Sequence, residues 1–199
     1  MTATNSLLAT KCTTHAECPW MQTFTGKKFY PLHPELLDVD IEDIAHMLAL
    51  ECRYNGATKV HFSVAQHSVM VSQAVPPANA WVGLFHDATE AFLKDIPRPL
   101  KIILADHYKP LERALARRIG DVVGADLVNL PESVEIADRR ALATERRDLL
   151  VHKPDVTWDV RGLLEPYDYV IEPMTPAEAE KAFLIQAAKL MYTRGVRPT

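Results

Sequence analysis

Two histidines and two aspartates of this 199-residue chain stand in apolar segments and belong to the side-chain types that bind metal ions. His67 lies in "SVAQHSVMVS", His86 and Asp87 are neighbours in "GLFHDATEAF", and Asp138 lies in "VEIADRRALATE". Imidazole suits transition metals, and carboxylates extend the choice to harder ions. Ionisable groups on apolar helix faces are costly to bury unless they are paired or metal-bound. The pattern alone leaves two interpretations open, a metal site and a set of ordinary histidines.

These four side chains would form a metal site that stays open to a substrate. With two imidazoles and two carboxylates as protein ligands, an octahedral ion keeps about two positions for water and substrate, as catalysis requires. The three segments that carry the ligands must therefore lie side by side in the fold.

All three segments are predicted to be helical. Glycine is scarce, with 7 residues, and the chain is rich in Ala, Leu, Glu and Arg, which favours helix over strand. Caps and prolines place the expected helices at 41–56 after Asp40, from about 63 to 75, at roughly 79–93, over 104–124 in one or two pieces, over 131–151, and at 176–195 after Thr175. The sequence thus predicts an all-α fold.

The length suits one domain with a substantial core of its own. We expect a single domain over 1–199, in which residues 1–39 form an irregular N-terminal arm with a short hairpin or ordered loop. Residues 40–150 form the catalytic core, and residues 151–199 form a C-terminal loop and helix.

Charge and composition limit the partners and the compartment. A net charge of −4 argues against a nucleic-acid polymer as partner, although a locally positive pocket can still bind a small anion. No apolar run is long enough to cross a membrane, and the N-terminus lacks the features of a secretory signal. Three cysteines give an odd count without a dense disulfide framework. We therefore expect a cytoplasmic protein that does not span a membrane.

Three segments, "FSVAQHSVMVS", "GLFHDATEAFLKDIPRPLK" and "EIADRRALATE", carry a resemblance to a known family. Over roughly residues 40–150 the chain resembles the HD-domain phosphohydrolases, with their signature H…HD…D. It is most similar to the bacterial 5′-deoxynucleotidases and the phage dATP triphosphohydrolases. Their second motif, "H-D-A-S-E-x-x-x-x-D-x-P-x-P-x-K", is matched by His86, Asp87, Ala88, Thr89, Glu90, Asp95, Pro97, Pro99 and Lys101.

The resemblance implies an HD-domain helical bundle that binds a divalent metal ion. Its ligands would be His67, His86, Asp87 and Asp138, and the ion would be Co, Mn, Zn, Ni, Fe or Mg. The ion would polarise a phosphoryl oxygen and acidify a water molecule.

Two further carboxylates follow His86 and Asp87 in the same segment. Glu90 would lie one helical turn beyond His86 on the same helix face, and the resemblance implies that it activates the attacking water. Asp95 would lie just past the helix end, where Pro97 and Pro99 stop the helix. Asp95 is expected either near the sugar or reaction centre, or as an ordinary residue of the turn.

Three residues are candidates for binding the substrate. Arg53 matches the arginine of an Arg-Trp pair in the similar enzymes, and a guanidinium binds phosphate oxygens in a bidentate manner. Tyr54 replaces the tryptophan of that pair, which puts selectivity for deoxyribose in doubt. Lys101 is a further candidate for the phosphate. Aromatic residues of the arm, among them Trp20, are expected to cover either the pocket or the core.

The resemblance implies an enzyme, a metal-dependent phosphohydrolase that acts on deoxynucleotides, and more specifically on purine deoxynucleotides. It would be either a dNMP 5′-nucleotidase or a dATP or dNTP triphosphohydrolase. The alternatives are a non-catalytic nucleotide-binding or regulatory HD domain and a hydrolase of (p)ppGpp or cyclic nucleotides. The resemblance also implies a homo-oligomer, either a dimer or a hexamer.

Overall fold

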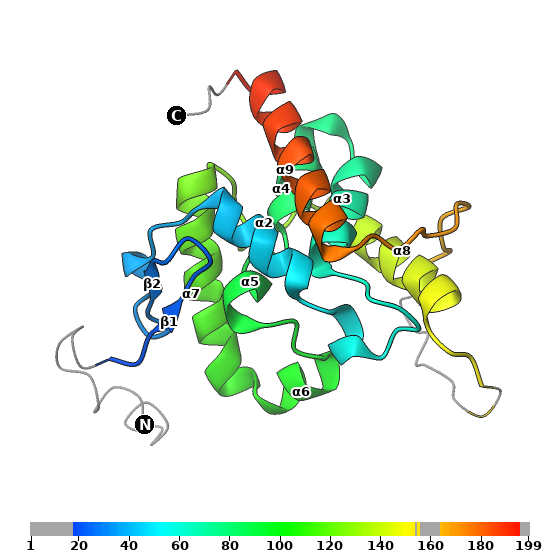
Figure 1. Ribbon diagram of the computed structural model, residues 1–199, viewed down its shortest axis with the longest axis horizontal. Coiled ribbons are helices and arrows are strands. Elements are labelled where there is room, and N and C mark those ends of the chain that lie inside the picture. The colour runs from blue at the N-terminus through cyan, green and yellow to red at the C-terminus, as the bar shows by residue number, and fades with distance from the viewer. Residues whose placement is uncertain (1–17, 154, 156–163, 196–199) are drawn as a thin grey trace.

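Helices make up most of the computed structural model, which describes residues 18–153, 155 and 164–195 (Figure 1). The predicted all-α class is confirmed. The arm contributes a two-stranded antiparallel hairpin, β1 (Met21–Gln22) and β2 (Lys28–Phe29). The helices are α2 (Ile41–Leu50), α3 (Val64–Ala74), α4 (Ala80–Phe85), α5 (Glu90–Leu93), α6 (Arg98–Ile103), α7 (Ala105–Val123), α8 (Glu132–Leu149) and α9 (Pro176–Thr193).

Side-chain caps begin three of these helices where the sequence predicts a start. Asp40 accepts a hydrogen bond from the backbone N of Glu42 and begins α2. Ser63 accepts one from the backbone N of Gln66 and begins α3. Thr175 forms a capping box at the start of α9. Each cap satisfies a backbone N–H group that the first helical turn leaves without a partner.

Helix α3 lies at the centre of the fold, where α2, α4, α8 and α9 pack against it (Figure 1). Phe85 of α4 and Phe183 of α9 meet edge to face, with ring centroids 5.4 Å apart, and both are completely buried. Buried aromatic pairs of this kind contribute both apolar area and a preferred geometry. The core therefore fixes α3, which carries His67, against the end of α4, where His86 is the next residue.

Two of the predicted helices are shorter than expected. The helix predicted at 79–93 is interrupted, because α4 ends at Phe85 and residues 86–89 form turns before α5 begins at Glu90. Ala88 and Glu90 bond there to carbonyl groups three residues back, which is tighter than the α-helical pattern. The helix predicted at 41–56 ends at Leu50, since Cys52 is extended and forms a β-bridge with Ser63.

The arm packs on α2 by polar and aromatic contacts. The backbone N and the hydroxyl of Thr25 donate to the Asp43 carboxylate at 2.6 and 2.9 Å. Phe29 is buried in the core against Phe92, whereas Trp20 is about half exposed. The described part of the arm covers the core, and residues 1–17 of the predicted arm lie outside the described residues. No helix in the described ranges has the length and apolar character needed to cross a membrane.

Candidate metal centre

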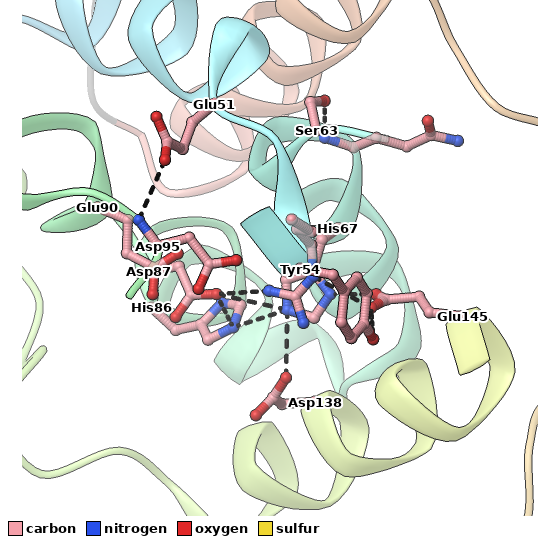
Figure 2. Close-up of polar contacts among 12 residues, drawn as sticks. Glu51, Tyr54, Ser63, His67, His86, Asp87, Glu90, Asp95, Asp138 and Glu145 are labelled. Carbon is pink, nitrogen blue, oxygen red and sulfur yellow. Dashed lines mark hydrogen bonds and ion pairs between the residues drawn. The ribbon is translucent and has the colours of Figure 1, made fainter. Parts of the chain in front are cut away.

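Three ligand atoms converge where α3 meets the turn between α4 and α5 (Figure 2). The two Nε2 atoms of His67 and His86 lie 3.3 Å apart. The Asp87 Oδ2 atom lies 3.2 Å from the His86 Nε2 and 3.5 Å from the His67 Nε2. Ligands at about 2.1 Å from a common ion lie about 3 Å from one another. This cluster of two histidines and one aspartate could therefore hold a metal ion.

The other nitrogen of each imidazole is bound to an acceptor that cannot donate. The His67 Nδ1 lies 2.6 Å from the Glu145 Oε1, and the His86 Nδ1 lies 2.8 Å from the Gly83 carbonyl oxygen. Each Nδ1 therefore carries the proton, and each Nε2 is the atom directed into the cluster. Outer partners of this kind orient histidine ligands in metal sites.

Asp138 approaches the cluster from α8. Its Oδ1 lies 3.2 Å from the His67 Nε2, and its side chain is 43% exposed. Asp138 is not one of the three residues whose ligand atoms all lie close together, and its contact with that group is the one with the His67 Nε2. A cation bound at the His67 Nε2 would therefore lie within reach of the Asp138 carboxylate.

The charges of the cluster shift the pKa values of its members. Burial opposes the ionisation of Asp87, but the neighbouring imidazoles and the Arg53 guanidinium hold its pKa well below the usual range. Burial and Arg53 also oppose a charged His67, yet the carboxylates of Glu145 and Asp138 raise the pKa of His67 to about 10. The surrounding carboxylates thus favour a positive charge at this point, either a proton or a metal cation.

The carboxylates Glu90 and Asp95 lie beside Asp87 (Figure 2). Glu90 is 4% exposed, and its Oε1 accepts a hydrogen bond from the Lys101 Nζ at 3.2 Å. Its Oε2 is buried and has no hydrogen-bond partner among the described residues. Burial, Asp87 and Asp95 all raise the pKa of Glu90 well above that of an ordinary glutamate, while the charges of Lys101 and Arg53 lower it.

Asp95 follows a sharp turn after α5. Lys94 adopts φ 74° and ψ 150°, a conformation that glycine occupies far more readily than lysine. Glu51 holds this turn, because its carboxylate contacts the Lys94 Nζ and accepts from the backbone N of Asp95 at 3.3 Å. Burial raises the pKa of Asp95, and the charge of Asp87 adds to that effect. The turn brings Asp95 towards the candidate metal centre, near Asp87 and Glu90.

The predicted substrate-binding residues lie in two places. Arg53 is buried beside the cluster, where its Nε donates to the Glu145 Oε2 at 3.0 Å and its Nη1 lies 3.5 Å from the Asp87 Oδ2. The Tyr54 hydroxyl donates to the same Glu145 oxygen at 2.6 Å. Lys101 lies further out, between Glu90 and Glu112.

An unusual backbone turn presents Arg53 and Tyr54 to the cluster. Tyr54, Asn55 and Gly56 adopt left-handed conformations in succession, with φ values of 56°, 52° and 76°. Left-handed conformations are unfavourable for residues other than glycine, so contacts elsewhere in the fold must hold this turn. Burial and the Glu145 carboxylate raise the pKa of Tyr54 well above the usual range, which keeps its hydroxyl protonated as a donor.

Glu145 is the member of the site that sequence reasoning missed. It is completely buried in α8 and bonds to His67, Arg53 and Tyr54. The segment "ADRRALATERRDLL" interleaves arginines with carboxylates, a pattern typical of an exposed, salt-bridged helix face, and this hides a buried carboxylate among exposed ones. A signal exists, because Glu145 stands two helical turns after Asp138 and therefore on the same face.

The fold and the site together define an all-α protein with a candidate metal centre of two histidines and one aspartate. No protein-family model matches the chain. "Uncharacterized protein YfdR" of Escherichia coli K12 is 38% identical over 165 residues, which cover 83% of this chain and 92% of that protein. "Uncharacterized protein RCAP_rcc00048" of Rhodobacter capsulatus is 31% identical over 187 residues, which cover 82% of this chain and 91% of that protein. The chain belongs to the family of these two proteins.

Proposed function

We propose that the protein is a metal-dependent phosphohydrolase of the HD-domain type that hydrolyses a deoxynucleotide. The observation that carries the proposal is the convergence of the His67 Nε2, the His86 Nε2 and the Asp87 Oδ2 beside a buried guanidinium. A cation site next to a fixed positive side chain suits an anionic substrate such as a phosphate group.

The donor set fits a divalent transition metal, with Co, Mn, Zn, Ni and Fe ahead of Mg because of the two imidazoles. His67, His86 and Asp87 would hold the ion, with Asp138 as the fourth ligand from α8. An ion bound there supplies Lewis-acid polarisation of a phosphoryl oxygen and lowers the pKa of a water molecule.

Glu90 is the proposed general base. Its Oε2, which lacks a hydrogen-bond partner in the described structure, accepts a proton from the water that attacks phosphorus. The phosphorus–oxygen bond to the leaving group then breaks, and the proton on Glu90 is available to the leaving oxygen. Lys101, at 3.2 Å from the other oxygen of Glu90, holds this carboxylate in place. Asp95 lies beside it as a candidate contact to the sugar.

Arg53 is the proposed phosphate-binding residue. Its guanidinium is held at the cluster by Glu145, so its orientation is set before the substrate arrives. Tyr54 contributes an aromatic ring beside the guanidinium, with 5.5 Å between the Arg53 Cζ and the ring centroid. The substrate class is a purine deoxynucleotide, by the sequence resemblance, as either a monophosphate or a triphosphate.

A substrate panel tests the proposal. The purified protein is incubated with dNMPs, NMPs and dNTPs in the presence of Mn, Co, Mg or Zn, and products are separated by chromatography. Release of phosphate from a monophosphate identifies a nucleotidase, and release of tripolyphosphate identifies a triphosphohydrolase. His86→Ala is expected to abolish turnover, whereas His107→Ala, at an exposed position of α7, keeps it. If the protein binds nucleotides but hydrolyses none of them with any of the metals, the proposal of an enzyme is wrong and a binding or regulatory domain takes its place.

The proposal includes a homo-oligomer, a dimer or a hexamer, in the cytoplasm. Helix α9 is the candidate subunit interface, because its large side chains Ile185 and Tyr192 are 58% and 88% exposed. Light scattering coupled to gel filtration measures the assembly directly. A monomer at micromolar concentration would remove this part of the proposal and leave the reaction untouched.

A further inference from the structure

The Glu145 carboxylate receives hydrogen bonds on both of its oxygens (Figure 2). The Oε1 faces the His67 Nδ1 at 2.6 Å. The Oε2 accepts from the Arg53 Nε at 3.0 Å and from the Tyr54 hydroxyl at 2.6 Å. One buried side chain therefore connects a candidate metal ligand to the candidate phosphate-binding pair.

We propose that Glu145 is a positioning residue that keeps the proton of His67 on Nδ1, so that Nε2 remains the atom able to bind a metal ion. The inference rests on the metal site of the proposed function, and it adds a requirement for a carboxylate at position 145. Its experiment uses metal binding and the protonation of one nitrogen, so it does not depend on finding a substrate.

The requirement for a carboxylate follows from the donors around it. An arginine side chain has donors and no acceptor, so the group that faces Arg53 must be an oxygen. A carboxylate offers an oxygen to Arg53 and another to His67 at the same time. A carboxamide offers one oxygen and one NH₂ group. In Glu145→Gln the oxygen must turn to Arg53, and the NH₂ group must face the His67 Nδ1.

That amide orientation forces His67 into the wrong tautomer for metal binding. The Nδ1 atom must now accept a hydrogen bond from the amide, so the proton of the neutral imidazole is confined to Nε2. The Nε2 atom points into the cluster, 3.3 Å from the His86 Nε2, and can no longer offer a lone pair there. Glu145→Gln therefore leaves the side-chain volume nearly unchanged, yet it prevents the His67 Nε2 from binding a metal ion.

A second substitution is expected to reverse the effect. Arg53→Met removes the donor that dictates the amide orientation. The Tyr54 hydroxyl can accept as well as donate, so it tolerates the NH₂ group of the rotated amide. In Arg53→Met/Glu145→Gln the amide oxygen can face the His67 Nδ1, and Nε2 regains its lone pair. A purely structural role for Glu145 predicts instead that the two substitutions add their damage.

The experiment titrates Co²⁺ into each variant by visible absorption and reads the His67 ring by ¹⁵N NMR of the metal-free protein. Glu145→Gln is expected to weaken Co²⁺ binding by about 10–100-fold. Its His67 Nδ1 loses the proton that the wild type carries. The double variant regains most of that affinity. The matched control is Glu135→Gln, an exposed glutamate of the same helix paired with Arg139, which leaves both readouts unchanged.

Three outcomes overturn the inference. One is a wild-type His67 whose Nδ1 carries no proton, which needs no variant to be folded. Another is a Glu145→Gln protein that binds Co²⁺ as tightly as the Glu135→Gln control. The last is a double variant whose loss of Co²⁺ affinity equals or exceeds the sum of the two single losses. If instead Co²⁺ binding follows the expected pattern and no nucleotide is hydrolysed, the proposed function fails. The inference that Glu145 keeps the His67 proton on Nδ1 then still stands.

Discussion

Metal binding is expected to stabilise the folded protein by an amount that can be worked out in advance. The ligand atoms of His67, His86 and Asp87 already lie within 4.8 Å of one another, so the ion enters a formed site. A ligand at a hundred times its dissociation constant stabilises the fold by about 2.7 kcal/mol. For a chain of this size each kcal/mol raises the melting temperature by about 2–4 °C, so Mn²⁺ or Co²⁺ should raise it by about 5–11 °C.

The assay is thermal unfolding followed by circular dichroism, with chelator or with added metal. His86→Ala removes one Nε2 from the cluster and should reduce the metal-induced rise to near zero. His107→Ala, an exposed histidine of α7, should show the same rise as the wild type. A His86→Ala protein with the full rise would refute the assignment of this cluster as the metal site.

The same measurement has a predictable pH dependence. In the metal-free protein the carboxylates of Glu145 and Asp138 outweigh burial and raise the pKa of His67 to about 10. The raised pKa stabilises the metal-free fold most below about pH 6.5, and this contribution is lost as the pH rises towards 10. Metal binding requires an unprotonated Nε2, so the proton competes with the ion. The metal-induced stabilisation should therefore grow by about 1.4 kcal/mol per pH unit between pH 6.5 and 8.5.

Three other substitutions test neighbouring parts of the structure. Glu90→Gln should keep the metal-induced rise in melting temperature and lower kcat by about 10²–10⁴-fold, measured by phosphate release; normal turnover would remove the role of Glu90. Lys101→Met removes the positive charge that lowers the pKa of Glu90, so the acidic limb of the kcat/KM profile should move to higher pH. Phe183→Ala empties a fully buried core position and should cost about 3–5 kcal/mol in urea unfolding.

Helix starts were predictable from the sequence because the interactions that form them are local. Asp40, Ser63 and Thr175 each cap a helix through a backbone N–H two or three residues further on. Such caps can be read from a few neighbouring letters. The helix break at 86–89 was not predictable in this way, because the segment contains neither proline nor glycine to mark a break.

The candidate ligands could be predicted from residue type and resemblance, whereas their partners could not. Glu145 stands 78 residues from His67 and 92 residues from Arg53 in the chain. Its place two helical turns after Asp138 puts it on the face of the helix that meets the cluster, but that spacing does not reveal its partners. Arg53 was predicted as a residue that binds the phosphate of the substrate, and in the structure its guanidinium is paired with the carboxylates of Asp87 and Glu145. Pairings of this kind depend on tertiary packing.

The left-handed turn at 54–56 has a consequence for the dynamics of the protein. Each residue other than glycine in this conformation costs roughly 1–2 kcal/mol, so Tyr54 and Asn55 together work against the native shape of the turn. Long-range contacts hold it, among them the backbone N of Arg53 on the Phe62 carbonyl. Amide protons in the turn should therefore exchange with solvent by a local opening that costs far less than global unfolding. We therefore expect the segment that carries Arg53 to open locally while the helices that carry the histidines stay folded.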